Sequence, residues 1–122
     1  MDHVIFSLTV QSMHPIPALE TLRQRERIPG KPRPDDEYFY SAGPTFSFDE
    51  EDWQPRADKL DHAVDEALRI LEATGVNNND LAHEDVFVRA FFTFWPGAQT
   101  ISAEIVERLA RVHATIWIDA EA

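Results

Sequence analysis

The sequence predicts a single α+β domain with a mostly antiparallel sheet and helices on one of its faces. Stretches with the composition or alternation of β-strands cover residues 4–10, 38–41, 45–48, 86–95 and 114–120. Two other stretches, at about 56–74 and 102–112, carry apolar residues at helical spacing. A length of 122 residues, 43% of them hydrophobic, suits one hydrophobic core. We therefore expect residues 1–122 to form one domain.

The first third of the chain predicts a strand, a short helix and a loop. The stretch "VIFSLTV", at 4–10, mixes β-branched and aromatic residues and indicates a largely buried first strand. Pro17 stands where a helix can begin, and we expect this helix to end near Arg25. The stretch "IPGKPRPDD", at 28–36, holds three prolines and a glycine, which predicts an extended loop without a regular element.

Two aromatic runs follow, and the turn-forming residues "SAGP" separate them. This pattern predicts a β-hairpin with 38–41 and 45–48 as its arms. Pro44 favours a position at the edge of the sheet, because proline cannot donate a backbone hydrogen bond.

A long amphipathic helix is expected from about Arg56 to Thr74. Gly75 is placed to end it, and "NNND" predicts a polar loop after it. The apolar positions of the helix fall on one side, at Leu60, Val64, Ala67, Leu68 and Leu71.

The most apolar stretch, "VFVRAFFTFW" at 86–95, predicts a strand in the interior of the sheet. The long helix is expected to pack on its apolar face, which contains Val86, Val88, Ala90, Phe92 and Phe94. The opposite face is mixed, because it contains Arg89 among aromatic residues.

The last predicted elements are a helix and a strand. Ser102 is a suitable N-cap, and Glu104 places an acid in the first turn, where the helix dipole favours it. The buried stripe of this helix is expected to be Ile105, Val106 and Leu109. In "ATIWIDA", Ile116 and Ile118 are expected to face inward and Trp117 to face the other side. The predicted order is βαββαβαβ, which is the ferredoxin-like βαββαβ pattern with an added C-terminal helix and strand.

The C-terminal stretch "VFVRAFFTFWPGAQTISAEIVERLARVHATIWIDA" combines an apolar strand, a turn with glycine, a Ser-led helix and a closing strand. Together with "VIFSLTV" and the helix "LDHAVDEALRILE", in matching order, it resembles the bacterial domain of unknown function 4279. The family's Trp-Arg-Lys-Gly segment is absent, and the chain has "RQRERIPGKPRPDDEYFYSAG" instead. The resemblance implies a small α+β domain of the bacterial cytoplasm, and some relatives of this family resemble immunity proteins that neutralise toxins.

The formal net charge of −11 is concentrated in the middle of the chain. Residues 35–85 hold fifteen acids and three bases, whereas residues 1–34 hold three acids and five bases. Such a charge distribution repels nucleic-acid phosphates and anionic membranes, and it attracts basic proteins. We therefore expect neither a nucleic-acid nor a membrane partner.

Other features of the composition exclude further classes of protein. The chain has no cysteine, which excludes disulfides, thiol catalysis and thiolate metal ligands. No apolar run approaches the roughly 20 residues of a membrane span, and "MDHVIFSLTVQ" lacks the basic start of a signal peptide. These features predict a cytoplasmic protein, and nothing in the sequence indicates a cofactor.

Four consecutive acids, from Asp49 to Asp52, stand directly before Trp53. A calcium loop needs alternating acids and a central glycine, and this stretch has neither. The dipole of the following helix stabilises one or two of the acids, by about 0.3–1 kcal/mol each. We expect no metal site here, and the acids are either solvated surface or a contact for a basic partner.

The helix after these acids carries an acidic stripe opposite its apolar side, and Arg69 can pair with Asp65 within it. The stripe consists of Asp58, Asp61, Asp65 and Glu72. It is either a solvated helix face or a surface for a basic partner, since such a partner would offset the repulsion between the carboxylates.

The five histidines show no spacing typical of metal ligands, so the chain is expected to have no metal site and to bind no divalent metal tightly. Asp119 with His113, or His83 with Asp85, could form an acid–base pair, but no activated nucleophile accompanies them. We therefore expect no enzyme activity and no catalytic residue.

The aromatic residues are numerous enough to fill a small core, and most of them are expected to do so. Four are hard to bury all at once, and aromatic anchors surrounded by charge are common at protein interfaces. These four are Tyr38, Tyr40, Trp53 and Trp95.

The sequence favours a non-enzymatic, acidic domain that binds a basic protein, such as an immunity protein (antitoxin) that occludes a toxin. The expected contact residues are Asp49, Glu50, Glu51, Asp52, Trp53, Asp58, Asp61 and Asp65. One alternative is a ligand-binding or enzymatic domain with a pocket near Arg89, between the mixed sheet face and the proline-rich loop. Another is a domain that forms oligomers without any chemistry, and the sequence is compatible with a monomer or a homodimer.

Overall fold

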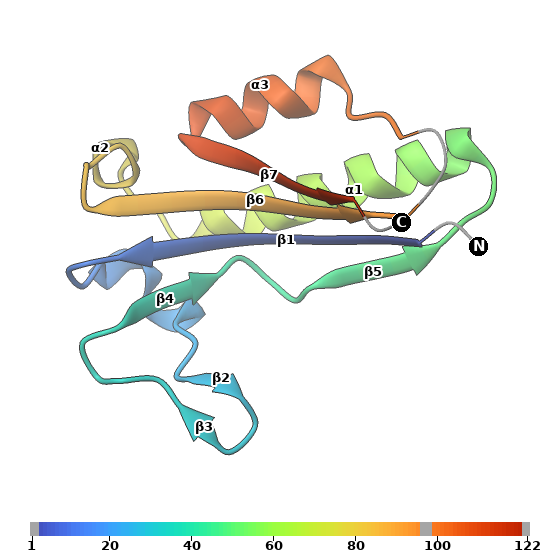
Figure 1. Cartoon of the computed structure of the whole chain (residues 1–122). Coiled ribbons are helices and arrows are strands. Elements are labelled where there is room, and N and C mark those ends of the chain that lie inside the picture. Colours follow the sequence, from blue (N-terminus) through green and yellow to red (C-terminus); the bar gives the residue numbers. More distant parts are fainter. Residues whose placement is uncertain (1–2, 96–98, 121–122) are drawn as a thin grey trace.

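The computed structural model describes residues 3–95 and 99–120 (Figure 1). Its main sheet has the strand order β4-β1-β6-β7, and β5 also pairs with β1. The β1 strand is antiparallel to β4, β5 and β6, whereas β7 runs parallel to β6. The prediction of an α+β fold with a mostly antiparallel sheet is therefore confirmed. The five strands are β1 (His3–Ser12), β4 (Tyr38–Ser41), β5 (Phe46–Asp49), β6 (Val86–Phe94) and β7 (Ala114–Ala120).

Two α-helices, α1 (Trp53–Ala73) and α3 (Ala103–Arg111), lie on the same face of this sheet (Figure 1). The α1 helix packs mainly against β1, and α3 packs against β7. The helix predicted after Pro17 is a 3₁₀-helix, η1 (Pro17–Leu22). The stretch expected to be a polar loop contains a one-turn helix, α2 (Asn78–Leu81), because the Asn77 side chain caps its start.

The core lies between the sheet and these helices. Alternate residues of β1, from Val4 to Val10, are fully buried on this face, as a strand with one covered face requires. The predicted apolar stripe of α1 is buried as well, and Ile105 and Leu109 of α3 complete the same cluster. Gly75 follows the end of α1 with φ +73°, which confirms its predicted role as a terminator.

The β6 strand lies in the interior of the sheet, between β1 and β7, as its sequence predicts. Its apolar face points to the helices, with Val88, Ala90 and Phe92 each 1% exposed or less. The α1 helix lies on this face, but its main contacts are with β1, since β1 is the central strand beside it.

The predicted hairpin of 38–41 with 45–48 is wrong, because β4 and β5 both pair with β1 and follow each other along its edge. The amide of Ala42 continues the β4 ladder by donating to the Leu8 carbonyl at 2.9 Å. Gly43 then makes a bend with φ +84°, so the chain shifts sideways without reversing. At ten residues, β1 is long enough to pair with both segments. The order of elements therefore follows the ferredoxin-like prediction, but the pairing of these strands does not.

The proline-rich stretch is also more regular than predicted. Its strand β3 (Lys31–Pro32) forms a small antiparallel pair with β2 (Glu26–Ile28), which ends at the first residue of the stretch, and Gly30 lies in the turn at φ +82°. The Glu37 carboxylate, just before β4, holds the β2–β3 pair in place. It pairs with Arg27 of β2 at 3.0 Å and with Arg33, which follows β3, at 2.6 Å.

The C-terminal elements agree with the prediction except in the burial of two residues, Val106 and Ile118. Val106, expected in the buried stripe of α3, is 42% exposed. The Ser102 hydroxyl accepts a hydrogen bond from the Ile105 amide at 3.2 Å, which confirms the N-cap of α3. Trp117 lies on the face away from the helices, beside Phe91. Ile116 is half-buried. Ile118 lies on the same face, opposite the buried Phe92, but it is 56% exposed, because β7 is the edge strand of the sheet.

Candidate functional site

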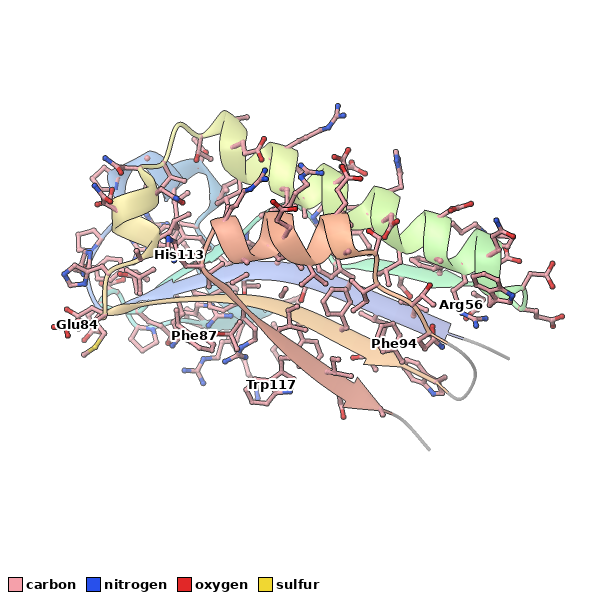
Figure 2. All side chains as sticks on the ribbon, turned by 90° about the horizontal axis from the view of Figure 1, so that it is seen from above. Arg56, Glu84, Phe87, Phe94, His113 and Trp117 are labelled. Carbon is pink, nitrogen blue, oxygen red and sulfur yellow. The ribbon has the colours of Figure 1, made fainter. Side chains whose placement is uncertain are left out.

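A buried arginine shapes the acidic segment between β5 and α1. Arg56 is 3% exposed, and its Nη1 donates hydrogen bonds to the carbonyls of Glu50 and Glu51 at 2.9 and 3.1 Å. Its Nε donates to Oε1 of Gln99 at 3.1 Å, which links the segment to the chain that precedes α3. Figure 2 shows Arg56 at the beginning of α1. The backbone oxygens thus turn toward the guanidinium, and the Glu51 and Asp52 side chains are exposed.

The first turn of α1 starts directly after these acids. Asp52 is the N-cap residue, but its side chain forms no capping hydrogen bond. Its carboxylate is exposed beside the positive end of a helix of 21 residues, where a negative charge is stabilised. Trp53, the first helical residue, is 57% exposed. An exposed aromatic ring therefore adjoins exposed carboxylates.

Glu50 differs from its neighbours because it has a partner within the chain. Lys59 Nζ lies 3.0 Å from Oε2 of Glu50. This hydrogen bond is the main reason why the pKa of Glu50 lies below its ordinary value of 4.5. Asp49, at the end of β5, also has an interaction within the structure. These two predicted contact residues are therefore already engaged.

The acidic stripe of α1 faces α3 over part of its length. Arg108 of α3 donates from Nη1 to Oδ1 of Asp65 at 2.6 Å, and Arg69 lies 2.8 Å from the same carboxylate, as its spacing predicts. Asp61 is half-buried near Ser102, and burial raises the pKa of its carboxyl group above 3.8, although hydrogen bonds from Ser102 oppose this shift. Asp61 and Asp65 thus interact with α3 or its N-cap residue within the same chain. We therefore do not count them among the residues that remain available to a partner protein.

A pocket of about 440 Å³ lies between β5 and α1. Phe46 and Phe48 line it from the sheet, and both face the helices because their partners on β1 are buried. Asp58, His62 and Glu66 line it from α1, and their spacing of four residues places them along one side of the helix. The pocket therefore has an apolar floor, and its charged border on α1 consists of two carboxylates and Lys59, beside His62.

Sequence reasoning identified Asp58 and missed the rest of this pocket. Two signals were visible, the alternation of Phe46 with Phe48 and the i, i+4 series from Asp58 to Glu66. These signals predict a pocket only if the strand that pairs with β5 is known, because the pairing of β5 with β1 places the two phenylalanine rings on the face toward α1. No local pattern contains that information.

The aromatic residues proposed as interface anchors have different environments. Tyr40 is 1% exposed, and its hydroxyl accepts a hydrogen bond from the Ile16 amide at 3.0 Å, so it belongs to the core. Tyr38 is half-buried beneath the Arg23 guanidinium, 4.8 Å from its ring centroid. Trp95 is half-buried and engaged within the structure. Trp53 alone among the four is largely exposed.

The sheet face opposite the helices carries Arg89 among aromatic rings, of which Figure 2 labels Phe87 and Trp117. The Arg89 Cζ lies 5.1 Å from the Phe87 centroid and 4.6 Å from that of Trp117. Its Nε is buried, and no hydrogen-bond partner for it is found among residues 3–95 and 99–120. Phe87 and Trp117 are 40% and 47% exposed. Arg89, Phe87 and Trp117 form a cation–π cluster whose aromatic rings are partly exposed. Arg89 is the residue near which the sequence placed the pocket of a ligand-binding domain.

A comparison of the chain with protein-family models, with curated proteins and with solved structures gives no significant match. Among the described residues, no helix is both long enough and apolar enough to cross a lipid bilayer.

Proposed function

We propose that this chain is a non-enzymatic binding domain that engages a basic protein through the surface at the beginning of α1. The observation that carries the proposal is a set of exposed carboxylates on α1 and just before it, together with the exposed Trp53. Asp58 and Glu66 line the Phe46 and Phe48 pocket, and Glu51 and Asp52 directly precede Trp53. We call these carboxylates the acidic rim, which consists of Glu51, Asp52, Asp58 and Glu66.

The acidic rim is available to a partner because its charges are not neutralised within the chain. In the described ranges, no lysine or arginine nitrogen lies within 4.0 Å of its four carboxylates, in contrast to Glu50 and Asp65. Glu51 and Asp52 are neighbours in the chain and repel each other, and lysine or arginine side chains of a partner would offset this repulsion. The charge would also accelerate the encounter with a basic protein.

The apolar groups beside the acidic rim supply the contact area that charges alone do not. Trp53 is the kind of large, exposed aromatic residue that frequently contributes most to binding at interfaces. The pocket floor of Phe46 and Phe48 can accept an apolar side chain or the aliphatic part of a lysine or arginine. A basic protein with such a side chain at its surface is therefore the expected partner.

The resemblance to the domain of unknown function 4279 narrows the kind of partner. An immunity protein neutralises a toxin by covering its functional surface, and it needs no catalytic group or cofactor to do so. In this proposal the partner is a basic toxin of a bacterial cytoplasm, and the acidic rim covers its cationic surface.

Binding kinetics with the partner test the proposal. The partner is captured from the source cell or expressed from adjacent genes, purified, and measured against three forms of the chain at low and at high salt. The triple variant Glu51→Gln, Asp52→Asn, Asp58→Asn should associate more slowly and lose most of the salt dependence. The control variant, Glu26→Gln, Glu84→Gln, Asp119→Asn, removes the same charge from exposed positions elsewhere. Equal association rates for the two variants would contradict the proposal.

A second candidate function is the binding of a small anionic ligand at Arg89, and the exposed cation–π cluster favours it. A carboxylate on an aromatic ligand could pair with the guanidinium while its ring stacks on Trp117. Thermal-shift measurements with aromatic carboxylates, on the wild-type chain and on Arg89→Gln, test this function. Shifts of equal size in both proteins, or none in either, would exclude Arg89 as the binding group.

A further inference from the structure

Three groups that bind transition metals meet where β1 ends and β6 begins. His14, His83 and Asp85 each offer a ligand atom, and these atoms all lie within 4.8 Å of one another. The two imidazole rings are 5.1 Å apart between centroids, at 77° to each other, and Nδ1 of His83 lies 3.8 Å from the Asp85 carboxylate. Glu84 marks this end of the molecule in Figure 2, away from the end where Arg56 lies. The cluster is thus separate from the acidic rim.

The backbone holds the three groups in place. The β1 and β6 strands remain antiparallel partners up to the pair Ser12 and Val86. Beyond that pair, the Met13 amide donates to the Asp85 carbonyl at 3.1 Å, so the two segments stay together. The His14 amide donates to the Ser12 hydroxyl at 3.1 Å, which fixes the bend that brings His14 beside His83, in the segment before β6. Hydrogen bonds that are present without a ligand therefore preorganise the cluster.

The side chains can close around an ion with small movements. A tetrahedral site with bonds of about 2.0–2.1 Å places its ligand atoms roughly 3.3 Å apart, compared with a present separation of at most 4.8 Å. The side chains of His83 and Asp85 are 48% and 45% exposed, so rotation about their side-chain bonds meets little obstruction. His83 Nδ1 now accepts a hydrogen bond from the Asp85 amide at 3.1 Å, and this bond would be given up if Nδ1 became the ligand.

The donor atoms select the class of ion. Two imidazole nitrogens and one carboxylate oxygen suit zinc, cobalt and nickel, whereas calcium and magnesium prefer sites made of oxygen. Three protein ligands leave a fourth position for water.

We propose that His14, His83 and Asp85 bind one divalent transition-metal ion of the zinc class, with water as the fourth ligand. The bound ion joins the segment after β1 to the segment before β6, and it stabilises the folded state because the unfolded chain has no such cluster. The expectation of no metal site rested on sequence spacing, which cannot detect ligands that lie far apart along the chain.

Calorimetric titration of the purified, metal-free chain with zinc tests this proposal. We expect one ion per chain, with an affinity that excess magnesium and calcium leave unchanged. His14→Gln, His83→Gln and Asp85→Asn should each weaken binding at least about tenfold, in line with losses seen when metal sites are perturbed. His62→Gln, which removes an exposed histidine of α1, is the control and should bind zinc as the wild type does. Circular dichroism verifies that every variant is folded.

A second measurement uses cobalt, whose visible absorption reports tetrahedral coordination by nitrogen and oxygen. The wild-type chain should show this absorption at one equivalent of cobalt, and His83→Gln should not. Absence of saturable zinc binding would overturn the proposal. Zinc binding that is unchanged in the three cluster variants would overturn it as well, because the ion would then be held by other acids. Neither result bears on partner binding by the acidic rim.

Discussion

Arg108 of α3 lies against Asp65 of α1, with Nη1 of the arginine 2.6 Å from Oδ1 of the aspartate. This pair joins two helices on the same face of the sheet (Figure 1). Its hydrogen bond is the main reason why the pKa of Asp65 lies below the ordinary value of 3.8. Part of the acidic stripe on α1 thus has its basic partner within the same chain.

Asp65→Asn should therefore lower the melting temperature in a pH-dependent way. A carboxyl group whose pKa is lower in the folded state stabilises the fold above its unfolded pKa, and this stabilisation disappears as the pH falls through the folded value. The difference between variant and wild type should be largest at neutral pH and should shrink as the pH falls below 3.8. Thermal unfolding followed by circular dichroism at several pH values measures it. A deficit that is the same at all pH values would show that the pair acts through packing alone.

Asp61→Asn should have the opposite effect. Burial raises the pKa of Asp61, so its ionised form is disfavoured in the folded state at neutral pH. Asparagine removes the charge and keeps an oxygen that can accept hydrogen bonds from Ser102. We expect the variant to be at least as stable as the wild type at pH 7, with any gain lost as the pH falls below 3.8, where the wild-type carboxyl is protonated in both states. Urea unfolding of the variant and the wild type at pH 7 and at a pH below 3.8 tests this prediction. A clear loss of stability in the variant at pH 7 would contradict it.

Arg56→Met should destabilise the fold by about 3 kcal/mol, because it leaves the carbonyls of Glu50 and Glu51 without the cation that they share. Urea unfolding gives the free energy. Arg111→Met serves as the control, since its pair with Glu107 is exposed on both sides and should contribute little. If the two variants are equally stable, the acidic segment does not depend on Arg56 for its shape.

Gly43→Ala should cost more stability than Gly30→Ala. Both glycines have a positive φ, and an alanine there is strained by about 1–2 kcal/mol. A Cβ at Gly43 would also lie 2.7 Å from Cδ1 of Ile70, whereas a Cβ at Gly30 would meet nothing within 4 Å. The difference between the two variants in urea unfolding isolates the steric contact. The double variant Gly43→Ala, Ile70→Val should recover part of that difference, and no recovery would place the strain in the backbone.

Trp53→Ala should chiefly increase the rate at which the basic partner dissociates. The ring is 57% exposed in the free chain, so its removal should leave the stability of the fold almost unchanged. An anchoring aromatic residue affects dissociation, whereas the carboxylates of the acidic rim affect association. Measurement of both rate constants separates the two roles. An unchanged dissociation rate would remove Trp53 from the contact surface.

Much of the secondary structure could be predicted because its signals are local. The alternation in 86–95 and the apolar stripe of 56–74 correspond to β6 and α1, and the Ser102 cap and the Gly75 stop lie where predicted. The predicted hairpin failed because "SAGP" permits both a reversal and a sideways bend. Only the length of β1, which can pair with two segments in succession, favours the bend.

The candidate surface was predicted in part. The exposed run of Glu51, Asp52 and Trp53 follows from the sequence, because consecutive charged residues before a helix are rarely buried. The involvement of Glu50 with Lys59, and of Asp65 with Arg108, could not be predicted in the same way. Each of these two ion pairs depends on the position of a basic side chain from a later turn of α1 or from α3.

The sequence by itself determined the α+β class, the helices and strands with clear periodicity, and the acidic net charge. The tertiary structure decided which carboxylates remain available, which aromatic rings form a pocket, and which histidines meet an aspartate. The physical reason is the range of the interactions. Periodicity and capping act between residues a few positions apart, whereas ion pairs, pockets and metal ligands need atoms within a few ångströms that the chain brings together from distant positions.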